Sequence, residues 1–349
     1  MKKKIFLALF LISTLSIQAF GFNGDVKWQR DFGAGNSITS GVIVSGNNLL
    51  FGDVNGNFYA VNKNSGSRIW TASGNSGYGV EGYPAVTSNG NVVFTQSDGT
   101  ITCLKISDGS IVWNFIPNEN RSETVNDGAV AGAGLIFMVK SDAKLYALNE
   151  NDGSIAWTYK ASSQGLRTAP KYSDGIVFLG EYDGIFSMID AKTGTRINGG
   201  GAGGAVNTPE VANGVVYFSA WDGSINAVQI KSVIPLWDIN IGDTVTTPPS
   251  INNGIIAVGT GRGTIAGIDA KDGSILWKYE TENGEISKNI LNSGGAIMAG
   301  SDSGEIYVLN AKAGRLQTKV ASEAGMSTDG AFSDGVFYFA SDHKVYAID

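Results

Sequence analysis

One sixteen-residue pattern occurs seven times along the chain, and its copies begin 39 to 44 residues apart. The two clearest copies are DGTITCLKISDGSIVW, which begins at Asp98, and RGTIAGIDAKDGSILW, which begins at Arg262. Weaker copies begin at Asn55, Asp142, Asp183, Asp222 and Ser303. A fixed period near 40 residues is typical of one supersecondary unit that is repeated and stacked. The period therefore constrains the fold before any other feature is considered.

Each repeat contains four strand-like segments separated by turn signals. In the repeat around residue 260 we expect strands over 245–251, 254–259, 264–270 and 274–279, with Asn253-Gly254, Arg262-Gly263 and Asp272-Gly273 at the turns. The second segment is almost wholly apolar, which is typical of a strand covered on both faces. The sequence therefore predicts an all-β fold, a single eight-bladed β-propeller of four-stranded blades.

The last copy of the repeat is incomplete. It begins at Asp342 and ends with the chain at Asp349, before its turn and its outer strand. The missing half stands at the other end of the chain, where Gly24 to Trp28 resembles Gly273 to Trp277. We therefore expect residues 25–30 to form the outer strand of the blade built by residues 326–349. Such closure removes the open sheet edges that promote aggregation.

A tryptophan ends the outer strand of most repeats. It occurs as Trp28, Trp70, Trp113, Trp157, Trp237 and Trp277, whereas blades four and seven carry Asn198 and Thr318 in that place. We expect these rings to pack between neighbouring blades. A ligand platform is the alternative, but a residue that recurs in phase with the fold favours an architectural role.

The first 21 residues have the pattern of a secretory signal peptide: three lysines, an apolar run from Ile5 to Leu15, and small residues up to Gly21. We expect cleavage after Gly21, with cleavage after Ala19 as the alternative, and a propeller domain over residues 22–349. A retained N-terminal anchor is a weaker possibility, since the apolar run is too short to span a bilayer. No cysteine stands near the cleavage point to carry a lipid. A periplasmic or secreted protein that does not span the membrane is therefore expected.

Composition excludes several classes of function. The net charge is −7, or −10 without the three leader lysines, and no basic cluster follows, so nucleic acid is not an expected partner. The single cysteine, Cys103, cannot form an internal disulfide, and the single histidine, His343, cannot form half of a metal pair. Loop carboxylates such as Glu282 and Glu285 leave a glycosidase as a remote alternative. We expect no catalytic residue, no metal and no cofactor, and a monomer on its own.

The repeat, with Asp-Gly at its start and Gly and Trp near its end, resembles the PQQ-like propeller repeat of quinone-dependent dehydrogenases. The resemblance covers nearly the whole chain beyond the leader. Within that family, the layout is similar to the BamB family of outer-membrane protein assembly subunits. This resemblance implies a propeller without a cofactor, which binds a protein partner in the cell envelope. The dehydrogenases also carry a pair of adjacent cysteines and long insertions, neither of which is present here.

The same resemblance indicates a binding site. Leu166-Arg167, between blades three and four, looks like the Leu-Arg connection that contacts the partner in the BamB family. Tyr182 and Trp221 each precede an Asp-Gly turn between the second and third strands, in blades four and five. Because such turns and the connections between blades share one face of a propeller, we expect all four residues to form one protein-binding sector.

Several alternatives stay open at this stage. Tyr182 and Trp221 could simply cover neighbouring loops. The family's two aspartates before Thr208-Pro209 are missing, which leaves the identity of the partner open. A relative of the PQQ-dependent dehydrogenases and a module that binds glycan or cell-surface polymer are the other functions considered. The glycine-rich run 199–204 is expected to be a flexible link.

Overall fold

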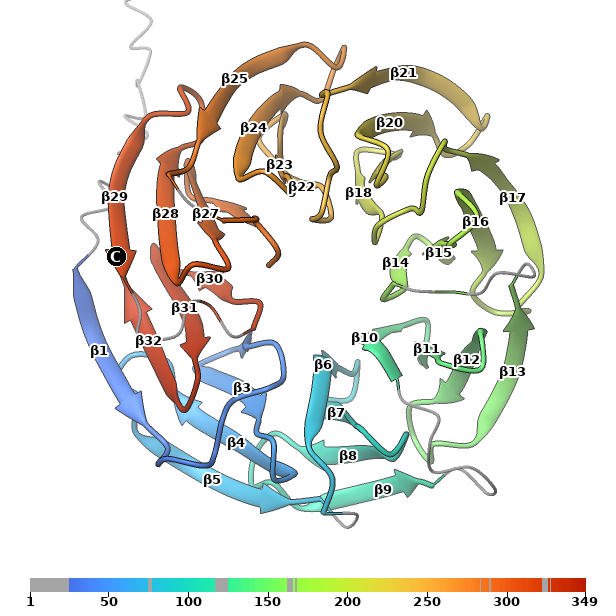
Figure 1. The fold of residues 1–349 in the computed structure, drawn as a ribbon. Coiled ribbons are helices and arrows are strands. Elements are labelled where there is room, and N and C mark those ends of the chain that lie inside the picture. Colours follow the sequence, from blue (N-terminus) through green and yellow to red (C-terminus); the bar gives the residue numbers. More distant parts are fainter. Residues whose placement is uncertain are drawn as a thin grey trace, which may run out of the picture.

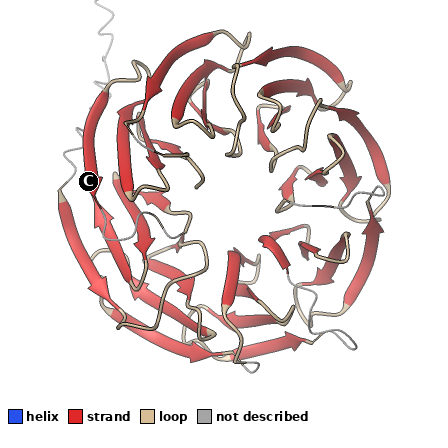
Figure 2. Ribbon diagram, in the orientation of Figure 1, coloured by secondary structure: helices blue, strands red, loops and turns tan. Residues whose placement is uncertain are grey.

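The structure is a computed structural model that describes residues 25–74, 77–116, 125–161, 166, 168–282, 284–288, 290–321, 326 and 328–349. All 32 regular elements in these ranges are strands, so the predicted all-β class is confirmed. Over the same ranges, the chain has no helix with the length and apolar character that crossing a membrane requires. Figure 1 shows the strands arranged in a ring around a central opening, and Figure 2 shows short loops joining them.

The strands follow one another in antiparallel groups of four, which we call blades and number along the chain. Blade one contains β2 (Ile43–Ser45), β3 (Asn48–Gly52), β4 (Asn57–Asn62) and β5 (Arg68–Ser73), and blade two contains β6 (Val80–Val86), β7 (Asn91–Gln96), β8 (Ile101–Lys105) and β9 (Ile111–Phe115). Blade three contains β10 (Val125–Gly132), β11 (Leu135–Lys140), β12 (Lys144–Asn149) and β13 (Ile155–Lys160), and blade four contains β14 (Lys171–Ser173), β15 (Ile176–Gly180), β16 (Ile185–Asp190) and β17 (Arg196–Gly201).

The second half of the chain repeats this order. Blade five contains β18 (Glu210–Ala212), β19 (Val215–Ser219), β20 (Ser224–Gln229) and β21 (Ile234–Asn240), and blade six contains β22 (Ser250–Asn252), β23 (Ile255–Gly259), β24 (Thr264–Asp269) and β25 (Ile275–Glu280). Blade seven contains β26 (Leu291–Ser293), β27 (Ala296–Gly300), β28 (Glu305–Asn310) and β29 (Leu316–Ala321). The last group joins β30 (Ala331–Ser333), β31 (Val336–Ser341) and β32 (Lys344–Ile348) to β1 (Val26–Asp31), in the order β1-β32-β31-β30.

Blades two and three are joined into one eight-stranded sheet by a single parallel pairing of Gly128 with Tyr83. Gly128 has a φ of 105°, and a Cβ placed there would lie 2.1 Å from the backbone nitrogen of Tyr83. Only glycine therefore permits this close approach of β10 to β6.

The hydrophobic core is divided among the joints between blades. The second strand of each blade is buried on both faces, and its alternating side chains enter different clusters. Leu49 and Phe51 pack against the last group of strands, whereas Leu50 packs against blade two. Each of the eight buried clusters draws its members from two neighbouring blades. Since strand side chains alternate between faces, each blade supports both of its neighbours.

The recurring tryptophans connect one blade to the next, as predicted. Trp113 illustrates the contact: its Nε1 donates a hydrogen bond to the carbonyl of Glu150, at 2.9 Å, and its ring covers Gly153 in the turn of blade three. Equivalent bonds run from Trp28 to Lys63, Trp70 to Ile106, Trp157 to Ala191, Trp237 to Ala270 and Trp277 to Ala311. We call this pairing of a ring with the next turn the tryptophan latch.

Two joints lack the tryptophan latch. At each of them both the tryptophan position of one blade and the facing turn of the next blade differ from the other repeats. Blade four carries Asn198 in place of tryptophan, and the facing turn of blade five carries Val233, with a φ of 53°, in place of glycine. Val233 packs instead against the cluster that contains the stacked rings of Phe186 and Phe218, whose centroids are 5.0 Å apart. Blade seven carries Thr318, and the blade that follows has no such turn, since β1 comes from the other end of the chain.

The first and last strands, β1 and β32, lie side by side in one sheet. β1 pairs antiparallel with β32, from Val26 opposite Ile348 to Asp31 opposite Lys344. The backbones of Asp25 and Asp349 exchange two hydrogen bonds of 3.1 Å. Lys63 of blade one, which is 8% exposed, reaches Asp334 of this last group at 2.6 Å, across the joint between the two sheets.

The glycine-rich run 199–204 is only in part the flexible link that the sequence predicts. Residues 199–201 lie within β17, and Gly199 pairs with Ser187 of β16. A Cβ at Gly199 would lie 2.2 Å from the carbonyl oxygen of Phe186. Half of the run is therefore a paired outer strand and not a link.

The turns before the outer strands predict an acid-sensitive contribution to stability. The pKa of Asp108, Asp152 and Asp272 is lowered, first by the hydroxyl of the serine two residues later and then by that residue's N–H. Because a depressed pKa means that the folded state holds these protons less tightly, the stabilisation is complete above the ordinary value of 3.8 and is lost as the pH falls through the lowered values.

A triple variant in which Ser110, Ser154 and Ser274 are all changed to alanine tests this acid-sensitive contribution. It should be less stable than the wild type at pH 7 and should lose less stability between pH 5 and pH 3, as measured by thermal melting. An acid decline of unchanged steepness would show that these turns do not contribute to it.

Candidate protein-binding face

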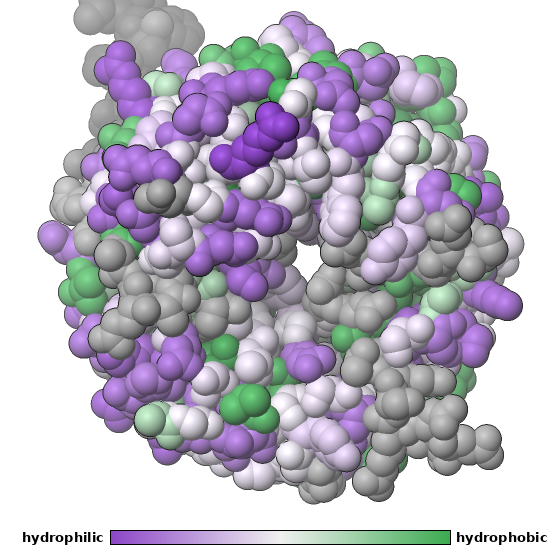
Figure 3. Space-filling model, in the orientation of Figure 1, coloured by the Kyte–Doolittle hydropathy of each residue, from purple (hydrophilic) through white to green (hydrophobic). Residues whose placement is uncertain are grey.

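The connections between blades lie beside the turns between second and third strands. Backbone bridges join the two kinds of segment at Ile38 with Asp53, Leu166 with Glu181, Val206 with Ala220, Val245 with Thr260, and Ile286 with Ser301. Both kinds of segment therefore share one side of the ring, which we call the connection face. Figure 3 shows one face of the ring, where polar side chains predominate and apolar side chains form small separate groups around a central hollow.

The structure brings Tyr182 and Trp221 to the two sides of one connection. The N–H of Val206 donates to the carbonyl of Glu181, at 3.2 Å, beside Tyr182. The N–H of Trp221 donates to the carbonyl of Ala205, at 3.1 Å. Tyr182 is 46% exposed and Trp221 is 41% exposed. Two half-exposed aromatic side chains thus stand on adjacent blades, on the connection face.

Leu166 takes a different place from the one expected. Its side chain is 3% exposed and belongs to the core cluster between blades three and four. It therefore cannot offer an exposed apolar anchor, which corrects that part of the prediction. Its equivalents in the bridges are Ile38, Val206, Val245 and Ile286, all buried. This recurrence of an aliphatic residue in phase with the repeat was the available signal that Leu166 is architectural.

Arg167 lies outside the described residues. In the register of the repeat it corresponds to Thr39, Asn207 and Thr246, each of which follows a buried aliphatic residue. An arginine is exceptional at this place. Its contact with a partner therefore stays a prediction.

Acidic side chains adjoin the two aromatic residues. Asp183 and Asp222 are exposed, and one carboxylate oxygen of each accepts a hydrogen bond from its own turn, from the N–H of Ile185 at 3.3 Å and of Ser224 at 3.0 Å. Asn207 is a further residue of this site, and the sequence did not predict it. Its side-chain oxygen accepts a hydrogen bond from the Trp221 indole, at 3.3 Å. Only the folded connection reveals this contact, since the two residues are 14 positions apart.

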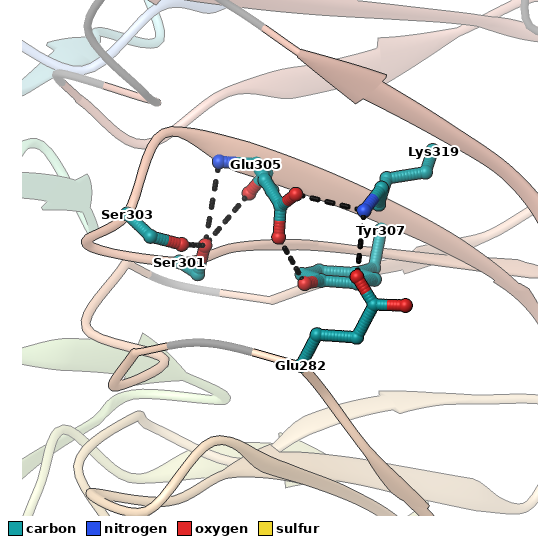
Figure 4. A network of polar contacts seen from close by, with 6 residues as sticks. All are labelled: Glu282, Ser301, Ser303, Glu305, Tyr307 and Lys319. Carbon is teal, nitrogen blue, oxygen red and sulfur yellow. Dashed lines mark hydrogen bonds and ion pairs between the residues drawn. The ribbon is translucent and has the colours of Figure 1, made fainter.

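A second polar cluster lies in blade seven (Figure 4). Lys319 of β29 reaches Glu305 of β28 at 2.7 Å and Glu282 at 3.1 Å, and the hydroxyl of buried Tyr307 donates to Glu305. Burial, followed by this hydrogen bond to Glu305, raises the pKa of Tyr307 to about 12. The hydrogen bond from Lys319 is the main cause that lowers the pKa of Glu305. These groups satisfy one another, so the cluster indicates an ion-pair network rather than an acid–base pair.

In the described part of the chain, His343 and Cys103 are engaged in other contacts or buried. His343 Nδ1 lies 2.8 Å from Asp342, and its Nε2 lies 3.7 Å from Asp31, at the seam between the two ends of the chain. The hydroxyl of Ser37 donates to Asp342 and not to the imidazole. Burial raises the pKa of Cys103 to about 12, which suppresses the thiolate. Among the residues that the structure describes, no group of three His, Cys, Asp or Glu side chains is placed to hold a metal.

The ring of four-stranded units, the core clusters between them and the recurrent tryptophan latch define a β-propeller of the PQQ-like repeat class. A family model described as outer membrane protein assembly factor BamB matches residues 15–126, 118–197 and 201–349. The chain belongs to this family.

Individual relatives are distant. Outer membrane protein assembly factor BamB of Nitrosomonas eutropha is 25% identical over 161 residues, which is 42% of this chain and 37% of that protein. The match therefore spans well under half of the relative.

Solved structures show how widely the fold occurs. BamB from Moraxella catarrhalis has a TM-score of 0.78 at 15% identity, over 93% of this chain and 99% of that one. The computationally designed Ika8 protein has a TM-score of 0.78 at 18% identity, over 91% and 99%. Sqt1 of Saccharomyces cerevisiae has a TM-score of 0.77 at 14% identity, over 94% and 99%. Such different proteins share the fold, so the fold alone does not decide the function.

Proposed function

We propose that this protein is a non-enzymatic scaffold of the cell envelope that binds another protein through its connection face. The observation that carries the proposal is the pair of half-exposed aromatic residues, Tyr182 and Trp221, on two sides of one connection. Tyrosine and tryptophan are enriched among the residues that dominate binding energy at protein interfaces. Membership of the BamB family supports a role in outer-membrane protein assembly.

In this proposal the signal peptide over residues 1–21 directs the chain to the periplasm and is removed. Residues 22–349 then act as one eight-bladed propeller, closed by β1 and monomeric on its own, without cofactor or catalytic residue. The pairing of β1 with β32 supports closure. Arg167 contributes a charged contact to the partner, and Leu166 holds its connection in place from inside the core.

The proposal predicts that Tyr182→Ala combined with Trp221→Ala abolishes capture of the partner. Truncating one true hot-spot residue costs about 2 kcal/mol or more, or about thirtyfold in affinity. Immobilised protein should therefore lose its partner from solubilised cell envelope, while the melting temperature stays within a few degrees. Arg167→Ala alone should weaken capture. Leu166→Ala is unsuitable as a test, since a cavity in the core costs about 2–5 kcal/mol by itself.

A matched control lies on the same two blades. Ile197 of β17 is 51% exposed and Leu236 of β21 is 50% exposed, but both belong to outer strands. Changing this pair to alanine removes similar apolar area and should leave capture intact. If the control pair loses the partner equally, or if the aromatic pair keeps it, the binding site is elsewhere.

A further inference from the structure

We propose that Asn207 is the positioning residue of this surface, because its carboxamide holds the Trp221 indole in the orientation that the partner contacts. The inference rests on the proposed function and adds to it a residue that no exposed surface would reveal. Asn207 is only 7% exposed, so it acts through Trp221 and not by its own contact.

Trp221 is held at two points by the connection that follows blade four. Its backbone N–H donates to the carbonyl of Ala205, at 3.1 Å, and its indole Nε1 donates to Oδ1 of Asn207, at 3.3 Å. The first contact places the Cα atom, and the second restricts the rotation of the side chain. The edge of the indole with the N–H therefore faces the protein, while 41% of the residue is exposed to a partner.

The other end of the Asn207 side chain is fixed just as firmly. Its Nδ2 donates to Oγ of Ser219, at 3.0 Å, and to the carbonyls of Val245, at 3.0 Å, and Thr247, at 3.3 Å. A carboxamide has two N–H donors and one carbonyl acceptor, so both polar atoms of the Asn207 side chain are engaged, with one N–H shared between two of the three acceptors. Blade five and the connection that follows it thus set the position of the oxygen to which the indole bonds.

Comparison with the other repeats shows which of the Asn207 hydrogen bonds recur in other blades. Thr39 and Thr246 occupy the same place as Asn207. Their hydroxyls donate to the carbonyls of Val80, the first residue of β6, and of Ile286, in the connection that leads into blade seven. A side-chain hydrogen bond from a connection to the backbone that leads into the next blade is therefore common to several blades. The additional acceptor toward an aromatic side chain is the carboxamide oxygen of Asn207. A threonine hydroxyl is bonded to Cβ, one bond nearer the backbone, so it does not extend to the position of this oxygen.

This comparison supplies a variant that separates the two roles. Asn207→Thr keeps a donor for the carbonyl of Val245, as Thr39 and Thr246 do in their blades, but removes the carboxamide oxygen from the indole. Melting should therefore stay within a few degrees of the wild type. Without the bond to Asn207 the Trp221 indole has more orientations to lose when the partner binds, so capture should weaken about three- to tenfold.

The positioning itself is measured without a partner, from the indole N–H signals in a proton–nitrogen correlation spectrum. The chain has seven tryptophans, and the signal of Trp221 is the one lost in Trp221→Phe. In Asn207→Thr that signal should shift and its hydrogen should exchange with water about tenfold faster. The six indoles of the tryptophan latches serve as internal references and should not move.

Capture from solubilised envelope is then compared across Asn207→Thr, Trp221→Phe and the double variant. If Asn207 acts through the indole, Asn207→Thr alone weakens capture relative to the wild type. The double variant then captures the partner no less than Trp221→Phe alone. An unchanged indole signal in Asn207→Thr overturns the positioning, and a changed signal with undiminished capture overturns its role in binding. Full capture by a Trp221→Ala variant would instead refute the proposed function, while the spectrum still decides the positioning.

Discussion

A chain that lacks residues 342–349 is expected to lose cooperative folding and to aggregate. These residues include β32, which lies between β1 and β31 in the last sheet. Val345 and Ala347 belong to the core cluster shared with blade one, and Ile348 belongs to the cluster shared with blade seven. Because all three are fully buried, the deletion removes core from both joints and leaves two strands with unpaired edges.

Deletion of residues 22–31 should have a smaller but still large effect. It removes β1 and the latch of Trp28 to the carbonyl of Lys63, and burial of one such ring contributes about 3 kcal/mol. The melting temperature should fall clearly, and the exposed edge of β32 should promote aggregation. Normal melting of either truncated chain would refute closure of the ring by the two ends.

A circular permutant provides the control for these deletions. Asp25 and Asp349 exchange two backbone hydrogen bonds, so a short glycine linker can join them as a hairpin. New ends can be placed at Asn213-Gly214, in the turn between β18 and β19, where Asn213 is exposed. The permutant keeps every strand and should melt close to the wild type. This result would show that the pairing of β1 with β32, and not the position of the chain ends, stabilises the ring.

The second large effect is expected for Trp113→Ala. Trp113 is 8% exposed, donates to the carbonyl of Glu150 and covers Gly153, so its loss leaves a cavity and an unpaired carbonyl at the joint between blades two and three. Large-to-alanine changes of buried aromatic residues cost about 3–5 kcal/mol. For a domain of this size the melting temperature should fall by about 5 °C or more.

Alanine substitutions at two glycines test the contribution of the turn that the tryptophan ring covers. Gly153 has a φ of 71°, and a Cβ there would lie 2.6 Å from the Trp113 ring, whereas Gly134 has a φ of 76° and nothing within 4 Å of its Cβ position. Alanine is strained at both places, but only Gly153→Ala also displaces the ring. Gly153→Ala should therefore be the less stable variant by thermal melting. Equal costs would mean that contact with the ring contributes nothing beyond backbone strain.

The features that repeat were the ones that sequence could predict. The period indicates the strand order, and the phase of Trp70 or Trp277 within it indicates that the ring contacts a neighbour, because one geometry recurs at each joint. The exceptions are informative too. Asn198 could be recognised from its own repeat, but its counterpart Val233 becomes meaningful only when the two turns are known to face each other.

The candidate site was harder to predict because it depends on what does not repeat. The family resemblance predicts Leu166 as a contact with the partner, whereas its register with Val206 and Val245 places it in the core. Asn207 could not be found from sequence. Its role depends on the direction of one carboxamide among three segments that meet only in the folded ring.

Site-specific photo-cross-linking in intact cells tests the central claim most directly. A photoreactive amino acid replaces Tyr182 or Trp221, and a matched control replaces Thr193, an exposed residue in the turn between β16 and β17 on the same half of the ring. We predict that irradiation joins positions 182 and 221 to the same envelope protein, and that position 193 does not join to it. Absence of an adduct from both aromatic positions, or an equal adduct from position 193, would contradict a protein-binding surface on the connection face.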